Sequence, residues 1–289
     1  MANYHPGITT VSIISMEAGV TASETDELSV EEPLEIGVRV QDVTRSIAVT
    51  MRTPGNDVEL AAGFLFTEGI LRDKAEIVEI RETDHNVVTA TLNSTVRLDP
   101  AKLDRHSFVS SSCGVCGKRS IAAVFAIQHH RIHPGTPQIE AGVIHRLPAI
   151  QRAAQDNFRR TGGIHASALF SSAGQLLSSY EDVGRHNALD KLIGSELLAG
   201  RLPLGDKILL VSGRASFELI QKASVAGIPV VAAIGAPSSL AVELARQTSM
   251  TLLGFVRDDR FNVYTDSGRL DLSSSCFDRN PHSVAVLNL

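Results

Sequence analysis

The sequence predicts an α/β protein in which a three-layer α/β/α domain follows a smaller α+β domain. Two short runs, 207–211 and 228–234, are almost continuously apolar, as expected for strands buried on both faces. Segments that we assign to helices separate these runs, and such alternation predicts parallel strands covered by helices. Hydrophobic residues make up 43% of the chain, which is enough to form a sizeable core.

The first 140 residues divide into a tail and a small domain. Residues 1–30 are polar and acidic and show no sustained period, so we expect a disordered tail. Residues 31–140 are expected to form the α+β subdomain, which includes a Cys-x-x-Cys loop. The expected elements are a strand at 34–40 with a hairpin partner at 47–51, a helix at 58–71, and a second hairpin at 76–81 and 86–92.

Residues 141–270 are expected to form the larger domain, and 271–289 a C-terminal tail. The expected order begins with a helix at about 148–159 and two strands at 164–170 and 175–180. It continues with a helix at 185–199, a strand at 207–211, a helix at 215–226, a strand at 228–234, a helix at 237–247 and strands at 251–256 and 261–265.

Composition and charge exclude several classes of protein. The net charge of -5 argues against a general nucleic-acid binder, whose affinity depends on neutralising phosphates. No run of 18 apolar residues is present, so we predict no membrane span. The N-terminus does not resemble a secretory signal, and three cysteines are too few for a disulfide scaffold, so a cytoplasmic location is predicted.

The motif Cys113-Gly-Val-Cys116 is typical of thiol chemistry. A helix is expected to begin at Lys118, and its amide dipoles with the nearby basic residues would favour a thiolate, the form that accepts sulfur as a persulfide. Half of a zinc site is an alternative, but Cys276 is the only other cysteine and closed zinc sites need four ligands. A thioredoxin-like redox centre would need a buried strand before the motif. The residues alone therefore support thiol chemistry well and sulfur transfer weakly.

Several turns could bind an anion or a nucleotide at the carboxyl edge of the sheet. The turn 211–216 contains Arg214, and both it and the turn 234–239 join a strand to a helix, where amides favour phosphate. Ordinary helix caps, including Pro237 as a first helical residue, explain the second turn nearly as well. The segment 255–260 combines an aromatic ring with two arginines, although a solvated charged turn is the commoner outcome.

A second candidate anion site lies at the start of the helix expected at 185–199. Asp182 could cap this helix, and Arg185 and His186 lie in its first turn. Simple capping with a solvated arginine and histidine is an equally good interpretation. His165 lies at a strand start, where a lone histidine is more often structural than a ligand.

The order of elements resembles the cytidine deaminase-like fold, but the deaminase chemistry is missing. Zinc deaminases carry His-x-Glu at one helix start and Pro-Cys-x-x-Cys at a later one. The corresponding segments here are His186-Asn-Ala188, which lacks the glutamate, and Gly213-Arg-Ala-Ser216, which lacks both cysteines. We therefore expect neither deamination nor a bound structural metal.

The chain also resembles the FdhD family, the formate dehydrogenase accessory sulfurtransferases. The resemblance covers about residues 32–265. It rests on seven segments in one order, at 51–57, 111–118, 161–166, 181–191, 211–218, 236–243 and 260–265.

This resemblance implies an enzyme that accepts sulfur from a cysteine desulfurase as a persulfide on Cys113, within a motif completed by Cys116. It implies transfer of that sulfur to a bis-molybdopterin guanine dinucleotide cofactor destined for formate dehydrogenase, and a homodimer. It places the cofactor-binding segment at Phe255, Val256, Arg257, Asp258, Asp259 and Arg260. A cofactor chaperone with dispensable cysteines and a thiol oxidoreductase remain as alternatives.

Overall fold

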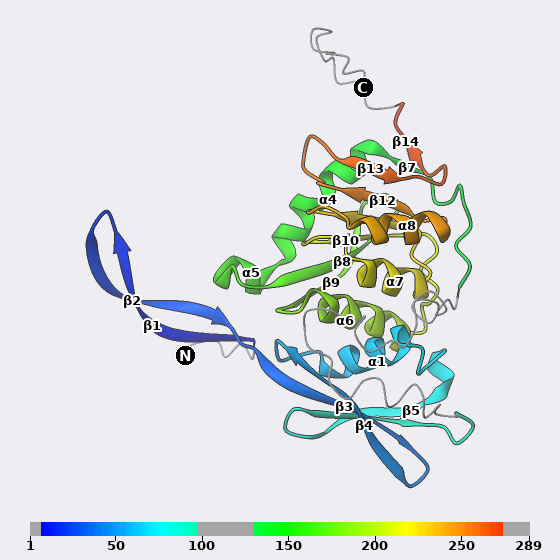
Figure 1. Cartoon of the computed structure of the whole chain (residues 1–289), viewed down its shortest axis with the longest axis horizontal. Helices are drawn as coiled ribbons and strands as arrows, with labels where there is room; N and C mark the ends of the chain where they lie inside the picture. The colour runs from blue at the N-terminus through cyan, green and yellow to red at the C-terminus, as the bar shows by residue number, and fades with distance from the viewer. Residues whose placement is uncertain (1–6, 97–129, 274–289) are drawn as a thin grey trace.

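The computed structural model describes residues 7–96 and 130–273. Cys113, Cys116, Cys276 and the helix expected from Lys118 lie outside the described residues. Figure 1 shows a hairpin that extends from the body, a small sheet at one end, and a larger sheet with helices on both of its faces. No helix in the described ranges is both long and apolar enough to cross a membrane.

The first two strands form an antiparallel hairpin, so the prediction of a disordered tail is wrong for residues 8–29. Strands β1 (Ile8–Glu17) and β2 (Val20–Ser29) pair without a register shift from Ile8 opposite Ser29 to Glu17 opposite Val20. Ala18 and Gly19 both have positive φ values, as a two-residue hairpin turn requires. Backbone pairing and this turn outweigh the polar composition on which the prediction was based.

The small sheet has the strand order β4-β3-β6-β5. Its members are β3 (Glu32–Val40), β4 (Val43–Arg52), β5 (Ile77–Asp84) and β6 (Val87–Leu92), and β3 and β6 run parallel. Helix α1 (Asp57–Thr67) and the short 3-10 helix η1 (Lys74–Glu76) connect β4 to β5. Both predicted hairpins and the predicted helix of this region are confirmed, and the helix ends four residues earlier than expected.

The larger sheet has six strands in the order β13-β12-β11-β10-β8-β9. They are β8 (His165–Ser171), β9 (Leu176–Asp182), β10 (Lys207–Val211), β11 (Val230–Ala233), β12 (Thr251–Gly254) and β13 (Asn262–Thr265). The central strands β10, β11 and β12 are parallel, as predicted, whereas β8, β9 and β13 pair with their neighbours in antiparallel fashion. The sheet is therefore mixed.

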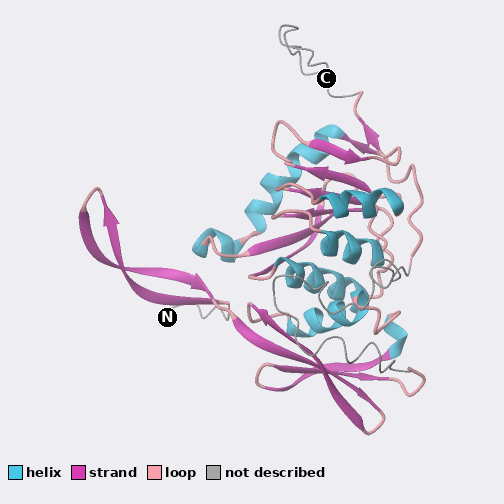
Figure 2. Ribbon diagram, in the orientation of Figure 1, coloured by secondary structure: helices cyan, strands magenta, loops and turns pink. Residues whose placement is uncertain are grey.

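Helices cover both faces of this sheet (Figure 2). They are α4 (Ala141–Ala154), α5 (Asp156–Thr161), α6 (Arg185–Leu198), α7 (Phe217–Val225) and α8 (Ser239–Gln247). Leu209 and Val211 of β10 belong to the cluster that contains α6 and α7, whereas Ile208 and Leu210 belong to the cluster that contains α4. Alternate residues of one strand thus face opposite helix layers.

Helix α4 differs from the prediction of one helix at 148–159. It begins at Ala141, contains Pro148 in its interior, and ends before Gln155, after which α5 begins. Val143, Ile144 and Leu147 are spaced to bury one apolar face against the sheet, and this burial outweighs the cost of an internal proline. The pair β7 (Ile139–Glu140) and β14 (Leu270–Asp271) lies beside this layer.

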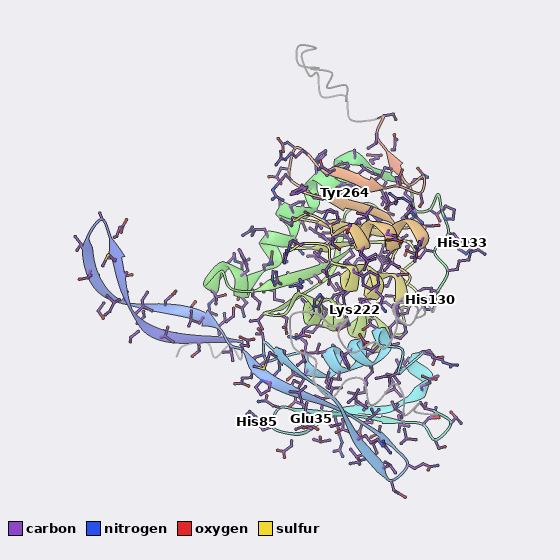
Figure 3. The ribbon with its side chains drawn as sticks, in the orientation of Figure 1. Glu35, His85, His130, His133, Lys222 and Tyr264 are labelled. Atoms are coloured by element: carbon purple, nitrogen blue, oxygen red, sulfur yellow. The ribbon has the colours of Figure 1, made fainter. Side chains whose placement is uncertain are left out.

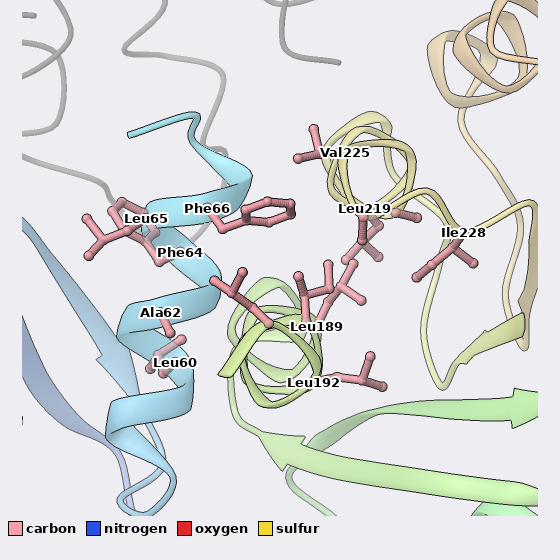
Figure 4. Close-up of a cluster of buried hydrophobic side chains, with 14 of the residues drawn as sticks. Leu60, Ala62, Phe64, Leu65, Phe66, Leu189, Leu192, Leu219, Val225 and Ile228 are labelled. Atoms are coloured by element: carbon pink, nitrogen blue, oxygen red, sulfur yellow. The ribbon is translucent and has the colours of Figure 1, made fainter. Parts of the chain in front are cut away.

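Helices α1 and α6 join the small sheet to the large one. A Cβ atom added to Gly63 would overlap the backbone carbonyl of Asp190, and one added to Gly194 would overlap that of Glu59. The two helices can approach this closely only because both positions are glycine. One hydrophobic cluster consequently runs from the small sheet through α1 and α6 to α7 (Figure 4).

Candidate functional site

A cavity of about 610 Å³ lies where the three parallel strands end. Ser212 follows β10, Ile234 follows β11 and Val256 lies just beyond β12, and all three contribute to its wall. The rest of the wall comes from α4, α5 and the turn before β8. In open α/β sheets, ligands bind at the carboxyl ends of the parallel strands. The wall is formed by Pro148, Ala149, Gln151, Arg152, Gln155, Phe158, Gly162, Gly163, Ile164, His165, Val183, Ser212, Ile234, Val256, Arg257 and Asp258.

The predicted cofactor segment 255–260 is only partly in this wall. Val256, Arg257 and Asp258 line the cavity, whereas Phe255, Asp259 and Arg260 are not among the lining residues. Arg257 donates from Nη1 to the carbonyls of Ile234 (2.8 Å) and Val256 (2.7 Å), which holds its guanidinium against the strand ends. Its amide donates to the carbonyl of Arg260 at 2.8 Å and closes a tight turn. Exposed Arg214 also lies outside the wall.

The residues that the sequence interpretation missed come from α4 and α5. The guanidinium of Arg152 lies 4.5 Å from the centre of the Phe158 ring, which gives the wall a cation on an aromatic surface. The carboxylate of Glu181 accepts hydrogen bonds from the amides of Asn157 and Phe158 and fixes the start of α5. Burial raises the pKa of Glu181, and these two amide donors oppose the rise.

Helix α4 and its junction with α5 contribute two glutamines to the cavity wall. Gln151 donates from Nε2 to the carbonyl of Leu210 at 3.1 Å. Gln155 is 3% exposed, and its Nε2 has no hydrogen-bond partner among the described residues. In the sequence, these two glutamines four residues apart and the pair Gly162-Gly163 that follows them are the pattern from which this part of the cavity wall could have been predicted.

His165 faces the cavity from the start of β8. Burial lowers its pKa, nearby Arg185 lowers it further, and Asp182 opposes this effect. The ring is therefore neutral at pH 7 and can act as a hydrogen-bonding group. Arg185 itself is not part of the wall.

The motif at 51–57 docks against the start of α6 instead of forming a binding site. Thr53 donates its amide to Asp182 (3.2 Å) and accepts a hydrogen bond from Lys191 on its carbonyl (2.8 Å). Lys191 is also paired with Asp182 at 2.7 Å. Asp182 therefore connects the two halves of the chain, and Gly184, not Asp182, is the cap residue of α6.

A second polar cluster lies at the starts of α6 and α7, on the other face of the sheet. The His186 Nε2 atom is 3.3 Å from the Ser216 hydroxyl and 3.6 Å from the Glu218 carboxylate. Deeper in the cluster, Lys222, which is labelled in Figure 3, is paired with Asp190 at 2.8 Å. Both side chains are buried. Burial would lower the pKa of Lys222, but the surrounding carboxylates raise it, so the lysine stays charged. Within the described ranges, no group of three potential metal ligands is present.

We expect His186 to stay neutral down to about pH 4. Burial lowers its pKa from 6.5 to about 4, and Glu218 only partly opposes this. Between these values the unfolded chain binds a proton that the folded chain does not, so the contribution of His186 to stability falls as the pH falls from 6.5 towards 4. A pH titration of the His186 ring by NMR tests this, and a midpoint near 6.5 would show that the ring is solvated.

The turn after β11 has the structure of a helix cap. Ser238 is the N-cap of α8 and accepts the amide of Ala241 on its hydroxyl at 3.3 Å. The capping interpretation is therefore correct for this turn. Pro237 is not the first helical residue, because α8 begins at Ser239.

Fold and site together define the protein as a mixed α/β protein with a polar cavity at the carboxyl edge of its larger sheet. The chain belongs to the FdhD/NarQ family, whose model matches residues 29–271.

Two curated relatives are named sulfur carrier protein FdhD. The one from Streptomyces avermitilis is 45% identical over 91% of this chain and 95% of its own. The one from Sulfolobus acidocaldarius is 41% identical over 91% of this chain and 98% of its own.

The fold also matches a solved structure from Desulfotalea psychrophila, described as a formate dehydrogenase accessory protein. The TM-score is 0.73 at 24% identity, and the match covers 92% of this chain and all of the other.

Proposed function

We propose that this chain is a sulfur carrier that accepts sulfur as a persulfide on Cys113 and delivers it to a molybdenum cofactor. The names of the relatives and the Cys-x-x-Cys motif support the carrier role. In the loading step, the Cys113 thiolate attacks the outer sulfur of a persulfide on a cysteine desulfurase, whose own thiolate is released. Cys116 completes the motif.

The cavity supports the identity of the acceptor, and this is the observation on which the proposal depends. The acceptor substrate is bis-molybdopterin guanine dinucleotide, whose nucleotide arms carry phosphates and a planar base. Arg152 and Arg257 supply positive charge, the glycine pair 162–163 exposes backbone, and the ring of His165 is available as a hydrogen-bonding group. The space of about 610 Å³ is in the range of small-molecule sites. We therefore place one guanine dinucleotide arm in the cavity.

Further parts of the proposal concern fold type and partners. The six-stranded mixed sheet with helices on both faces supports a cytidine deaminase-like domain in which His186-Asn-Ala188 replaces the deaminase motif. We propose a cysteine desulfurase as donor, formate dehydrogenase as recipient of the sulfurated cofactor, a homodimer as the working form, and the cytoplasm as its location. A resident metal is not part of the proposed mechanism.

Incubating the full chain with a cysteine desulfurase and cysteine tests the carrier role. We expect intact-protein and peptide mass spectrometry to find one added sulfur atom on Cys113, removable by a reducing thiol. A disulfide between Cys113 and Cys116 without added sulfur would support a thiol oxidoreductase instead. Unchanged cysteines would favour a cofactor chaperone.

A further inference from the structure

The hairpin of β1 and β2 projects from the body of the protein (Figure 1) and is anchored to it at its base. There the Ser29 hydroxyl donates to the Oδ1 atom of Asn157 in α5 at 2.7 Å, and Arg160 donates from Nε to the carboxylate of Glu27 at 2.7 Å. Towards the tip the side chains are open to solvent, and Met16 is 74% exposed. The hairpin is therefore a preformed arm, and we use that name for it below.

Both edges of the arm are open to pairing with another strand. Within the described ranges, the sheet of the arm contains only its own two strands. These strands pair with no register shift, so no β-bulge turns either edge away from a partner. No proline or lysine, the residues that commonly block an edge, occurs in residues 8–29. An isolated two-stranded hairpin is only marginally stable in water, so contact with a second chain would stabilise the arm.

The two faces of the arm differ in charge. Residues that are opposite one another on paired strands share a face, so the register assigns each side chain to one face. Three carboxylates, those of Glu17, Glu24 and Asp26, lie on the same face, which we call the acidic face. On the other face, which we call the neutral face, Glu27 is the only carboxylate, and it is paired with Arg160. The neutral face consists of Ile8, Thr10, Ser12, Ile14, Met16, Thr21, Ser23, Thr25, Glu27 and Ser29.

We propose that the neutral face is a dimer interface, and that a second copy of this chain covers it. The proposal rests on the homodimer of the proposed function and adds the surface through which that dimer forms. Charged residues are depleted at the centre of protein interfaces, so the neutral face is suited to burial and the acidic face to solvent. Ile14 and Met16 supply large exposed apolar side chains at the tip of the neutral face.

The size of the arm favours a second copy over a different protein. Two strands of ten residues, at about 3.3 Å per residue and about 4.8 Å apart, give a face of about 30 by 10 Å. One such face is well below the roughly 800 Å² that each partner buries in a stable interface. Two copies can exchange arms about a twofold axis, so that each protomer buries its own arm and the surface under its partner's arm. This exchange doubles the buried area, and each arm lies with its neutral face on the other protomer.

Met16→Asp and Val20→Asp are a matched pair of variants for the test. Both positions are at the tip, 74% and 71% exposed, but Met16 lies on the neutral face and Val20 on the acidic face. Sedimentation equilibrium of the wild-type full chain should give the mass of two chains. For Met16→Asp we expect the dissociation constant of the dimer to rise at least about a hundredfold, because an unpaired carboxylate is buried twice in a twofold interface. Val20→Asp should leave it nearly unchanged.

Ile14→Asp provides a second variant of the neutral face and should behave as Met16→Asp does, because Ile14 is 80% exposed on the same face. Far-UV circular dichroism should show that all three variants keep the fold, since each change is at an exposed position.

Three results would overturn the proposal. Wild-type dimer affinity in Met16→Asp and Ile14→Asp would show that the neutral face is not buried. Equal losses in these variants and in Val20→Asp would show that the two faces do not differ in function. A wild-type chain with the mass of one protomer would reject the homodimer as well, whereas persulfide loading of Cys113, measured on the same sample, decides the carrier role separately.

Discussion

Cells whose only copy of this chain carries Cys113→Ala should contain formate dehydrogenase with no measurable activity. The reason is chemical: a sulfur atom in transit must be covalently held, and alanine cannot hold it. The dehydrogenase protein should still be present, because this change affects the supply of sulfur and not the synthesis of the enzyme. Activity staining and immunoblotting of the same extracts test both parts.

Cys276→Ala is the matched control for this experiment. Cys276 is the remaining cysteine of the chain and lies outside the Cys-x-x-Cys motif. Its replacement should leave the dehydrogenase fully active. Wild-type activity in the Cys113→Ala cells would contradict sulfur transfer and support a cofactor chaperone.

Gly194→Ala should destabilise the protein by about 3 kcal/mol or more, a large fraction of the stability of a typical domain. The added methyl group would overlap the backbone carbonyl of Glu59, and a helix backbone cannot move aside as a flexible side chain can. To relieve the overlap, α1 and α6 must separate, which disturbs the cluster shared by both sheets. Urea denaturation followed by circular dichroism measures the loss.

Gly142→Ala provides a control of the opposite sign. Gly142 is an exposed residue of α4, and an added Cβ atom would meet only the Arg146 guanidinium, at 3.9 Å. We expect a gain of up to about 1 kcal/mol from helix propensity. Equal effects at the two glycines would mean that α1 and α6 do not depend on this close contact.

Much of the fold could be predicted because the strands of the larger sheet are buried on both faces. Their apolar runs are unambiguous, and the prediction for 207–211 matches β10 in both bounds. The first hairpin was missed because its stability comes from cross-strand pairing between polar residues, which leaves no hydrophobic pattern. The start of α4 was missed because a proline such as Pro148 is typical of the first turn of a helix. In the structure the helix begins seven residues earlier, at Ala141, because the residues before Pro148 are buried against the sheet.

The part of the site formed by the ends of the parallel strands could be predicted from the sequence, whereas the part formed by helices could not. The strand ends in a parallel sheet lie together, so the contributions of Ser212 and Arg257 to one edge follow from the topology. The rest of the wall depends on where α4 ends and how α5 packs, and no local pattern in the sequence fixes this. The burial of Gln155 follows from that packing and not from a pattern in the sequence.

The hairpin of β1 and β2 is long enough that charges at its tip and charges at its base are screened from one another. Each of its strands has ten residues, so at about 3.3 Å per residue its tip lies roughly 30 Å from its base. Ion screening extends only about 8 Å under physiological conditions. Glu27 is neutralised at the base by Arg160, but Glu17, Glu24 and Asp26 lie further out, and no lysine or arginine precedes Arg39. The tip, with Ile14 and Met16 exposed, therefore keeps the same negative potential whether or not phosphates fill the cavity.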